Sequence, residues 1–376
     1  MFISTPDGLS GLCERLRAHK VIAVDTEFLR EKSYHPKLCL IQVATADEAA
    51  AIDPQAISDL TPLMEVLADA SVTKVFHACD QDLEVIYDAC GCVVAPVFDT
   101  QLAAAFLGQR MQMGLGALVQ HYLGVHLDKA DGLTDWSRRP LDAEQLRYAI
   151  DDVLYLPRIY DLMMAELVGR DRLSWFEPEM AQLADPGRLR KDPREAYLRL
   201  KRSGSLTRRQ LAVAREVCVW REQAASRHDL PRKWMLSDEL VVEISRRAPQ
   251  RVDRLRRIRG TESLGERDAR EILEAVRRGL DCDPADYPTI RHRSRPSAQT
   301  DSVTDLMYAL LRLVSERHGV AVPLIATRDD LYAFAAGDKA CPLREGWRYE
   351  VCGRTLDGLL AGEVGLTVKD GSVETL

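Results

Sequence analysis

The stretch VIAVDTEFLR, residues 21–30, begins as a buried strand and then carries two acidic residues. Four small or β-branched apolar residues come first, as in a strand that is covered on both faces. Asp25 and Glu27 follow two positions apart, and side chains at i and i+2 of a strand point to the same face. Two carboxylates placed side by side repel each other unless a cation lies between them. The stretch therefore predicts either a metal site on a sheet or an exposed strand end with two hydrated acids.

The sequence around this stretch alternates between strand-like and helix-like segments. Apolar, β-rich runs occur at 21–28, 38–45 and 73–78, with a weaker one at 49–52. Helical spacing of apolar residues occurs at 60–69, 81–90, 99–107 and from about 142 to 167. This alternation predicts an α/β domain in which helices flank a mixed sheet.

The pattern becomes entirely helical after residue 206. Helical segments between 206 and 280 end at Pro or Gly positions, which is typical of a bundle of short helices. Residues 281–302 are rich in Pro, Ser and Arg, as an exposed linker is, and a second small helical unit follows them. No run approaches 18 apolar residues, so we expect no transmembrane helix and no membrane partner.

Further acids occur where an α/β fold builds its sites. Asp82 lies at the start of the helix that follows the strand-like run 73–78, at the edge where such folds bind ligands. Asp80, two positions earlier, is expected to cap this helix. On a later helix, Tyr148 and Asp152 are four residues apart and share one face. Each pattern is weak alone, but their combination with the two acids of the first strand favours a metal site.

The net charge of −7 conceals an uneven distribution. Residues 1–160 hold 13 Lys and Arg against 23 Asp and Glu, a charge of −10. Residues 188–299 hold 28 against 17, a charge of +11. An acidic front and a basic middle fit a metal-dependent nuclease with a separate module that grips nucleic acid, and helix faces of unequal charge are the alternative. The nine cysteines form no C-x-x-C pair, which indicates a reducing, cytoplasmic location.

Five segments together resemble the ribonuclease D family, in the tyrosine-bearing subgroup of the DEDD exonucleases. They are, in order, VDTEFLREKSYHPKLCLIQVA, KVFHACDQDLEV, FDTQLAAAF, TDWSRRPL and LRYAIDDVLYL. A second match, to the helicase-and-RNase-D C-terminal (HRDC) domain, rests on LRRIRG followed by EILEAVRRGL. The resemblance implies a ribonuclease H-like exonuclease domain at 1–168, a helical connecting arm at 169–206, an HRDC domain at 207–282 and a second HRDC-like helical domain at 300–376.

The resemblance also assigns roles to individual residues. The implied metal ligands are Asp25, Glu27, Asp82 and Asp152, and Tyr148 falls on the residue that orients the attacking water. The candidate substrate contacts are Phe28 and His77 near the site and, by resemblance, Gln42, Gln101 and Arg138. One departure is Cys79-Asp80-Gln81 in place of the frequent Gly-Ser-Glu, which leaves Asp82 in register. Because every implied ligand atom is oxygen, we expect two Mg²⁺ ions, for which Mn²⁺ could substitute.

The activity that the resemblance implies is that of a 3′–5′ exoribonuclease. Such an enzyme releases nucleoside 5′-monophosphates from RNA with a free 3′ end, and the family implies tRNA precursors as substrates. We expect a monomer whose basic module contacts RNA phosphates, although HRDC folds also contact proteins. Two alternatives stay open: a 3′–5′ exonuclease acting on DNA, since the metal chemistry is the same, and a non-catalytic RNA-binding protein on a nuclease scaffold. The complete set of acids argues against the second.

Overall fold

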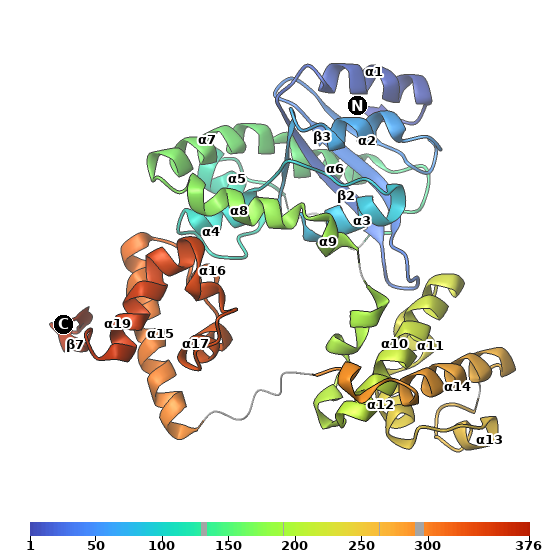
Figure 1. The fold of residues 1–376 in the computed structure, drawn as a ribbon. Helices are drawn as coiled ribbons and strands as arrows, with labels where there is room; N and C mark the ends of the chain where they lie inside the picture. Colours follow the sequence, from blue (N-terminus) through green and yellow to red (C-terminus); the bar gives the residue numbers. More distant parts are fainter. Residues whose placement is uncertain (129–133, 191, 263, 290–296) are drawn as a thin grey trace. The chain divides into compact units, whose positions relative to one another are not determined.

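Strand β2 (Val21–Leu29) contains the VIAVDTEF stretch and lies inside a six-stranded sheet with the order β1-β4-β3-β2-β5-β6 (Figure 1). The other strands of this computed structural model are β1 (Phe2–Ile3), β3 (Lys37–Ala44), β4 (Ala49–Ile52), β5 (Thr73–Phe76) and β6 (Val97–Asp99). Strand β2 is parallel to β5 and β5 to β6, whereas β3 and β4 are antiparallel. The expected α/β domain with a mixed sheet is thus confirmed. Strands β1 and β6 were not predicted, because two or three residues are too few to show a period.

Helices cover both faces of this sheet. They are α1 (Pro6–Leu16), α2 (Thr61–Ala68), α3 (Asp80–Cys90), α4 (Thr100–Phe106), α5 (Leu115–Leu123), α6 (Ala143–Leu154), α7 (Leu156–Gly169) and α8 (Leu173–Leu183). Helices α1 and α2 pack against each other and lie on the face opposite α6 (Figure 1). Ala23 of β2 and Val75 of β5 belong to the core that includes α4, α6, α7 and α8. Because side chains alternate along a strand, Asp25 and Glu27 face the same helical layer as Ala23.

The sequence predicted one continuous helix from about 142 to 167. This prediction is wrong in one respect, because the structure has two helices there, α6 and α7. They meet at Tyr155, whose φ and ψ of −93° and −16° depart from ideal helical values. Pro157 lies in the first turn of α7, where its missing N–H costs nothing, but it prevents one continuous helix. At the other end, Asp142 caps α6 by accepting hydrogen bonds from the backbone N–H groups of Glu144 and Gln145.

The chain divides into two compact units. Unit 1 comprises Met1–Phe28, Leu38–Pro186 and Arg295–Leu376, and unit 2 comprises Leu29–Lys37 and Gly187–Ser294. The structure describes all residues except 129–133, 191, 263 and 290–296. Among the described residues, no helix combines the length and the apolar character that crossing a membrane requires.

The C-terminal part of unit 1 shares a hydrophobic core with the α/β part. Its elements are α15 (Ala298–His318), α16 (Val322–Ile325), α17 (Arg328–Ala335), η4 (Pro342–Arg344), α18 (Gly346–Arg348), the π-helical turn η5 (Tyr349–Gly353), α19 (Arg354–Ala361), β7 (Leu366–Lys369) and β8 (Ser372–Thr375). The Arg172 guanidinium, at the start of α8, donates to the backbone carbonyls of Phe106, His318 and Gly319. Gly108 is glycine for a steric reason: a Cβ there would lie 2.9 Å from the carbonyl oxygen of Gly319.

Unit 2 is a helical bundle around the long helix α10. Its elements are α9 (Pro186–Leu189, which begins at the boundary), η1 (Pro193–Arg199), η2 (Ser203–Ser205), α10 (Arg208–His228), α11 (Arg232–Met235), α12 (Asp238–Arg247), α13 (Val252–Leu255), α14 (Glu266–Leu280) and η3 (Pro284–Asp286). Helices α10 and α14 approach closely at Gly279, where a Cβ would lie 2.4 Å from the Cα of Val213. The segment Leu29–Lys37 joins this unit through Tyr34, whose hydroxyl donates to Glu222 over 2.9 Å.

The division into units differs from the boundaries expected from sequence in two places. Helix α8 falls within the predicted connecting arm, yet it belongs to unit 1 and contributes Phe176 and Met180 to its core. The predicted second helical domain, 300–376, also belongs to unit 1 and ends in the antiparallel hairpin β7–β8. Sequence spacing did not reveal this arrangement, because the packing partners lie far apart in the chain: Phe176 of α8 packs on Phe98 and Phe106, and Trp347 packs on Trp175.

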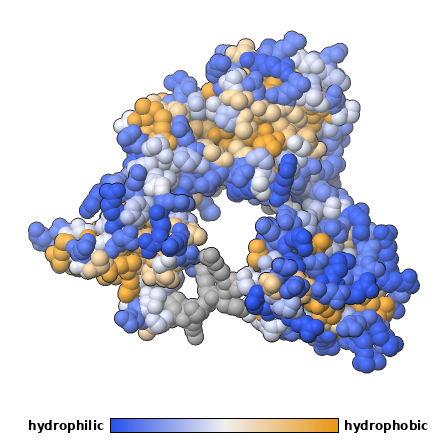
Figure 2. All heavy atoms as spheres, viewed as in Figure 1, coloured by the Kyte–Doolittle hydropathy of each residue, from blue (hydrophilic) through white to orange (hydrophobic). Residues whose placement is uncertain are grey.

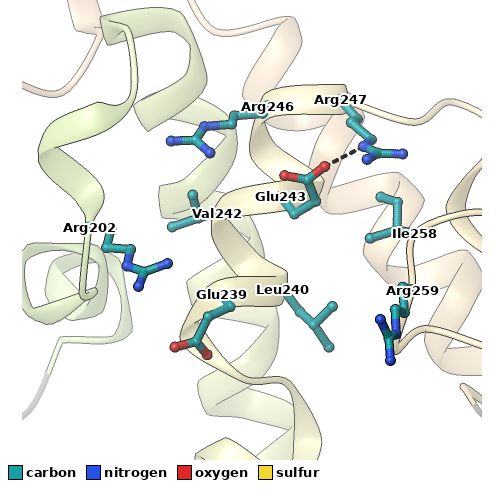
Figure 3. A pocket seen from close by; sticks show the side chains of 9 residues that line it. All are labelled: Arg202, Glu239, Leu240, Val242, Glu243, Arg246, Arg247, Ile258 and Arg259. Atoms are coloured by element: carbon teal, nitrogen blue, oxygen red, sulfur yellow. Dashed lines mark hydrogen bonds and ion pairs between the residues drawn. The ribbon is translucent and has the colours of Figure 1, made fainter.

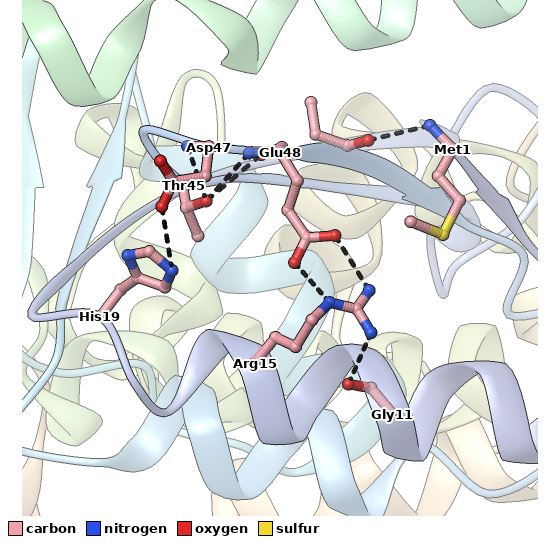
Figure 4. A network of polar contacts seen from close by, with 8 residues as sticks. Met1, Gly11, Arg15, His19, Thr45, Asp47 and Glu48 are labelled. Carbon is pink, nitrogen blue, oxygen red and sulfur yellow. Dashed lines mark hydrogen bonds and ion pairs between the residues drawn. The ribbon is translucent and has the colours of Figure 1, made fainter.

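A polar network holds α1 against the start of β4 at one edge of the sheet (Figure 4). Arg15 pairs with Glu48 over 2.7 Å and also donates to the carbonyl of Gly11 over 2.9 Å. The amino group of Met1 donates to the carbonyl of Ala49 over 2.9 Å. These contacts are largely exposed, so each adds little to stability, but together they fix the edge of the sheet.

Candidate active site

Three carboxylates meet where β2 approaches α6. Asp25 and Glu27 come from β2 and Asp152 from α6, and one oxygen atom of each lies within 4.8 Å of the others. The strand supplies two of them because its alternation directs Asp25 and Glu27 to the helical face. All three side chains are partly buried.

Asp82, on helix α3, lies outside this group of three, but it is near enough for its charge to raise the pKa of Asp25 and of Glu27, in both cases after the larger effect of burial. It lies in the first turn of α3 and is 7% exposed, and its Oδ1 accepts a hydrogen bond of 2.5 Å from the Thr26 hydroxyl. Thr26 stands between Asp25 and Glu27 in sequence and so points to the opposite face of β2. Its hydroxyl therefore ties α3 to the strand that carries the other two acids. Asp25, Glu27, Asp82 and Asp152 are called the carboxylate cluster below.

The turn before α3 is fixed by Asp99, which ends β6. One carboxylate oxygen of Asp99 accepts from the backbone N–H groups of Ala78, Gln101 and Leu102, at 3.2, 2.8 and 3.1 Å. The other accepts from the N–H of Cys79 at 2.9 Å. Ala78 has a positive φ of 64°, which a non-glycine residue adopts only when its surroundings impose it. Asp99 thus sets the path of the chain into α3, and with it the place of Asp82.

Asp80 does not cap α3 as expected. The N-cap residue is Cys79, which makes no capping hydrogen bond with its side chain, and Asp80 lies one position later in the first turn. A carboxylate in the first turn still interacts favourably with the helix dipole.

Tyr148 lies one turn before Asp152 on α6, next to the cluster. Burial raises the pKa of Asp152, and the interaction with the Tyr148 hydroxyl opposes that shift. Burial, followed by the charges of Asp152, Glu27 and Asp25, raises the pKa of the Tyr148 phenol. Tyr148 therefore stays protonated at neutral pH and can act as a hydrogen-bond donor. Its ring lies 6.0 Å from that of Trp136, which is 3% exposed and packs beside it.

Burial raises the pKa of every member of the cluster, and the charges of neighbouring carboxylates add to the shift. The pKa of Glu27 rises to about 8 and that of Asp152 to about 7, in both cases mainly through burial. Burial raises the pKa of Asp82 to about 6, although the Thr26 hydrogen bond opposes the shift. The pKa of Asp25 is well above its ordinary value through burial and then through the charges of Asp82, Asp152 and Glu27.

This donor set fits hard divalent cations. Several anionic oxygens within a few ångströms of one another repel when ionised, and a bound cation would remove the repulsion. The identified ligand atoms are all oxygens, which Mg²⁺, Mn²⁺ and Ca²⁺ prefer over the nitrogen and sulfur donors that zinc commonly takes. The cluster can therefore hold metal ions, and a purely structural role would not explain why these acids are gathered where burial raises the pKa of each of them.

The predicted substrate contacts occupy different environments. Phe28 is half-buried at the end of β2, directly after Glu27. The Nδ1 atom of His77 lies 2.9 Å from the Thr100 hydroxyl, and burial lowers the pKa of His77 so that the ring is neutral. Gln101 donates to the carbonyl of Met113 over 3.1 Å.

The last two predicted contacts differ sharply in exposure. The Arg138 side chain is 83% exposed and forms an ion pair of 3.3 Å with Asp135. The Gln42 side chain is fully buried in β3, and its amide forms no hydrogen bond with any residue that the structure describes. Gln42 can contact a substrate only if the surrounding chain moves, so its predicted role has the least geometric support.

Sequence reasoning missed Thr26 and Asp99 as supports of the cluster. Thr26 lies inside the D-x-E pattern, but nothing in its residue type signals a bond to a helix 56 residues later. The sequence did contain a signal for Asp99, because an acid at the start of a predicted helix, here 99–107, commonly caps it. That signal does not indicate that the same carboxylate also holds the turn at Ala78 and Cys79.

Comparisons with known proteins agree on one family. Residues 1–168 match a family model described as 3′–5′ exonuclease, and residues 210–276 match the HRDC domain. Ribonuclease D of Acidiphilium cryptum is 39% identical over 100% of this chain and 97% of its own length. Ribonuclease D of Sphingobium indicum is 41% identical over 97% of this chain and 96% of its own length.

Solved structures give the same result. RNase D of Escherichia coli, described as an exoribonuclease involved in structured RNA processing, has a TM-score of 0.83 and 31% identity. The match covers 96% of this chain and 98% of that one. The catalytic core of RRP6 from Trypanosoma brucei has a TM-score of 0.55 and 27% identity, covering 74% of this chain and 79% of that one.

Proposed function

Because this chain belongs to the ribonuclease D family and is a 3′–5′ exoribonuclease, we propose that the carboxylate cluster is where it hydrolyses RNA, with two divalent cations held by the four acids. The observation that carries this proposal is the convergence of Asp25, Glu27 and Asp152 oxygens within 4.8 Å. Asp82 joins them electrostatically, since its charge helps to raise the pKa of Asp25.

The reaction consumes one water for each nucleotide removed. A water oxygen attacks the phosphorus of the last phosphodiester, and the bond from phosphorus to the 3′-oxygen of the preceding nucleotide breaks. The last nucleotide leaves as a 5′-monophosphate, and the shortened RNA keeps a 3′-hydroxyl. When bound, the cations supply a water of lowered pKa and neutralise charge on the leaving oxygen.

The residues of this chain orient the reactants. The Tyr148 hydroxyl, protonated and beside Asp152, would hold the attacking water by a hydrogen bond. The ionised acids would hold the cations and keep the terminal phosphate in one orientation. Tyr148 would not act as a general base, because its raised pKa keeps the phenol protonated.

The finer identity of the ion and the substrate is also part of the proposal. Mg²⁺ is the preferred ion, with Mn²⁺ as substitute, because the donor atoms are carboxylate oxygens. Phe28 and His77 would contact the terminal nucleotide, and Gln42, Gln101 and Arg138 the nucleotides around it. The substrates would be tRNA precursors with unpaired 3′ ends. The enzyme would act as a monomer in the cytoplasm, where thiols stay reduced, in line with nine cysteines that form no disulfide in the described part of the chain.

The test uses a short RNA labelled at its 5′ end with an unpaired 3′ tail. Purified protein is incubated with this RNA in Mg²⁺ or in EDTA, and in parallel with DNA of the same sequence. We expect a ladder that shortens from the 3′ end only with metal, nucleoside 5′-monophosphates as products, and little shortening of the DNA.

Two results would contradict the proposal. Equal ladders in Mg²⁺ and in EDTA would exclude the metal-dependent mechanism. Wild-type turnover in Asp152→Asn would show that the carboxylate cluster is not the site of hydrolysis.

A further inference from the structure

Unit 2 contains a pocket lined by arginines on one face of helix α12 (Figure 3). Its volume is about 340 Å³. The lining residues are Arg202, Glu239, Leu240, Val242, Glu243, Arg246, Arg247, Ile258 and Arg259, and this set is called the arginine pocket. Four guanidinium groups against two carboxylates give the pocket a net positive charge. The face of unit 2 seen in the space-filling view is largely hydrophilic (Figure 2).

Hydrogen bonds and close packing fix the walls of the arginine pocket. Arg246 donates to the Ser205 hydroxyl over 2.6 Å, and that hydroxyl donates to the carbonyl of Arg202 over 2.7 Å. This chain of bonds joins the segment before α10 to helix α12. On the other side, Gly260 has a φ of 97°, and a Cβ there would lie 3.2 Å from Leu240. The turn that carries Arg259 therefore packs closely against α12.

The positive charges of the pocket are only partly neutralised within the protein. Arg247 is paired with Glu243 across one turn of α12, as Figure 3 shows. Arg259 forms no hydrogen bond or ion pair with any residue in the described part of the chain. Val242 and Ile258, which are 4% and 1% exposed, form the apolar part of the lining, called the apolar floor. A ligand for such a pocket should combine an anionic group with a compact apolar part.

We propose that the arginine pocket binds a phosphodiester group, with its attached ribose, of the RNA whose 3′ end is being trimmed. Guanidinium groups donate several hydrogen bonds to phosphate oxygens, and the ribose carbons would lie on the apolar floor. No side chain of the pocket offers an aromatic surface for a base, so the contact would not distinguish sequences. This inference rests on the proposed function, since it requires RNA to be the substrate.

If the pocket binds RNA, the enzyme should hydrolyse a long RNA, which can also occupy the pocket, more efficiently than a short RNA that occupies only the active site. The test replaces two arginines in Arg202→Gln/Arg259→Gln and compares the hydrolysis of a tailed, tRNA-sized RNA with that of a trinucleotide. The matched control is Arg267→Gln/Arg270→Gln on α14, which removes the same charge from the same unit at side chains that are 79% and 70% exposed.

The expected result is a fall of about tenfold in the ratio of kcat/KM for long RNA to that for the trinucleotide, in the pocket variant alone. A tenfold change is what the loss of one charge-assisted hydrogen bond to a phosphate produces. The slope of the logarithm of the RNA dissociation constant against the logarithm of salt concentration should fall by about one in the pocket variant, measured in an Asp152→Asn background. If the double variant is unstable, Arg259→Gln alone should reproduce the effect in part, with Arg259→Lys closer to wild type.

The outcomes separate the pocket from the proposed function. A wild-type protein that shortens neither RNA refutes the proposed function and removes the basis for the pocket. A wild-type preference for long RNA that both double variants retain refutes the pocket alone, and it would leave an acidic protein segment as the occupant to consider. Equal losses in both double variants would also refute it, because they would show a diffuse effect of charge.

Discussion

At the scale of single residues, the carboxylate cluster stores unfavourable electrostatic energy when no metal is bound. Its members have raised pKa values, about 8 for Glu27, about 7 for Asp152 and about 6 for Asp82. Carboxyl groups in an unfolded chain titrate near pH 4. Between pH 4 and pH 8 these carboxyl groups therefore bind more protons in the folded protein than in the unfolded one, and their contribution to the free energy of unfolding falls as the pH rises.

This gives a pH-dependent prediction for the metal-free protein. In EDTA, the midpoint of thermal unfolding should fall between pH 5 and pH 8, and Glu27→Gln should make the decline shallower by removing one of the acids. Adding Mg²⁺ should raise the midpoint more at pH 8 than at pH 5, because the ion binds ionised carboxylates. Glu65→Gln, at a 64% exposed side chain of α2, is the control and should not change the slope. A wild-type midpoint that rises steadily over this range would contradict the account.

Tyr148 offers a second test at this scale. Tyr148→Phe should lower kcat by about 10²-fold, the cost of a poorly oriented nucleophile. It also removes the hydroxyl whose interaction lowers the pKa of Asp152, so the acidic limb of the pH–rate profile should move to higher pH. Tyr160→Phe is a suitable control, since Tyr160 packs on Phe98 at 4.8 Å in the core of the same unit. An unchanged kcat and pH profile in Tyr148→Phe would remove its proposed role.

At the scale of structural elements, the cluster depends on how β6 holds the start of α3. Asp99 accepts four backbone hydrogen bonds, and Asn in its place would set an amide N–H against one of these donors. Asp99→Asn should therefore displace the turn before Asp82 and raise the Mg²⁺ concentration needed for half-maximal activity. Leaving a buried donor unpaired should also cost about 1–3 kcal/mol of stability.

The control for this change is Asp53→Asn. Asp53 is 3% exposed and receives two hydrogen bonds, of 2.6 and 2.7 Å, from Arg139 in the same unit. Its substitution should reduce stability to a similar degree without altering the Mg²⁺ requirement. If both variants need the same Mg²⁺ concentration as wild type, Asp99 has a structural role only.

The sequence predicted the elements of the site better than the bonds between them. The D-x-E pattern and the spacing of Tyr148 and Asp152 follow from strand and helix periods, which local sequence specifies. The link from Thr26 to Asp82 and the reach of Asp99 to Ala78 depend on how β2, β5 and β6 align. Such long-range packing leaves no periodic signal in the sequence. The break between α6 and α7 leaves none either, and Pro157 is the one residue that indicates it.

At the scale of the whole molecule, the C-terminal segment of unit 1 belongs to the core of the catalytic unit. Trp347 is 6% exposed, stacks on Trp175 with ring centroids 5.7 Å apart, and donates from Nε1 to Glu179 over 3.0 Å. Arg348 adds a second contact to Glu179 at 2.5 Å. The burial of this cluster indicates that residues 297–376 stabilise the fold that carries the active site.

Trp347→Ala should therefore destabilise the catalytic unit by about 3–5 kcal/mol, the usual cost of truncating a large buried aromatic residue. The measurement is the rate of heat inactivation of RNA hydrolysis, together with thermal unfolding. Trp234→Ala is the matched control, because Trp234 is 56% exposed in unit 2. Equal inactivation rates in the two variants would show that the C-terminal segment does not support the catalytic unit.

The most direct test of the central claim is a titration of the protein with Mn²⁺, in which free ion is measured by electron paramagnetic resonance. The carboxylate cluster should bind Mn²⁺ in the wild-type protein, more tightly at pH 8 than at pH 5.5, and Mg²⁺ should displace it. Asp25→Asn should lose this binding while its circular dichroism spectrum stays that of the wild type. Undiminished Mn²⁺ binding in a folded Asp25→Asn variant would contradict the account.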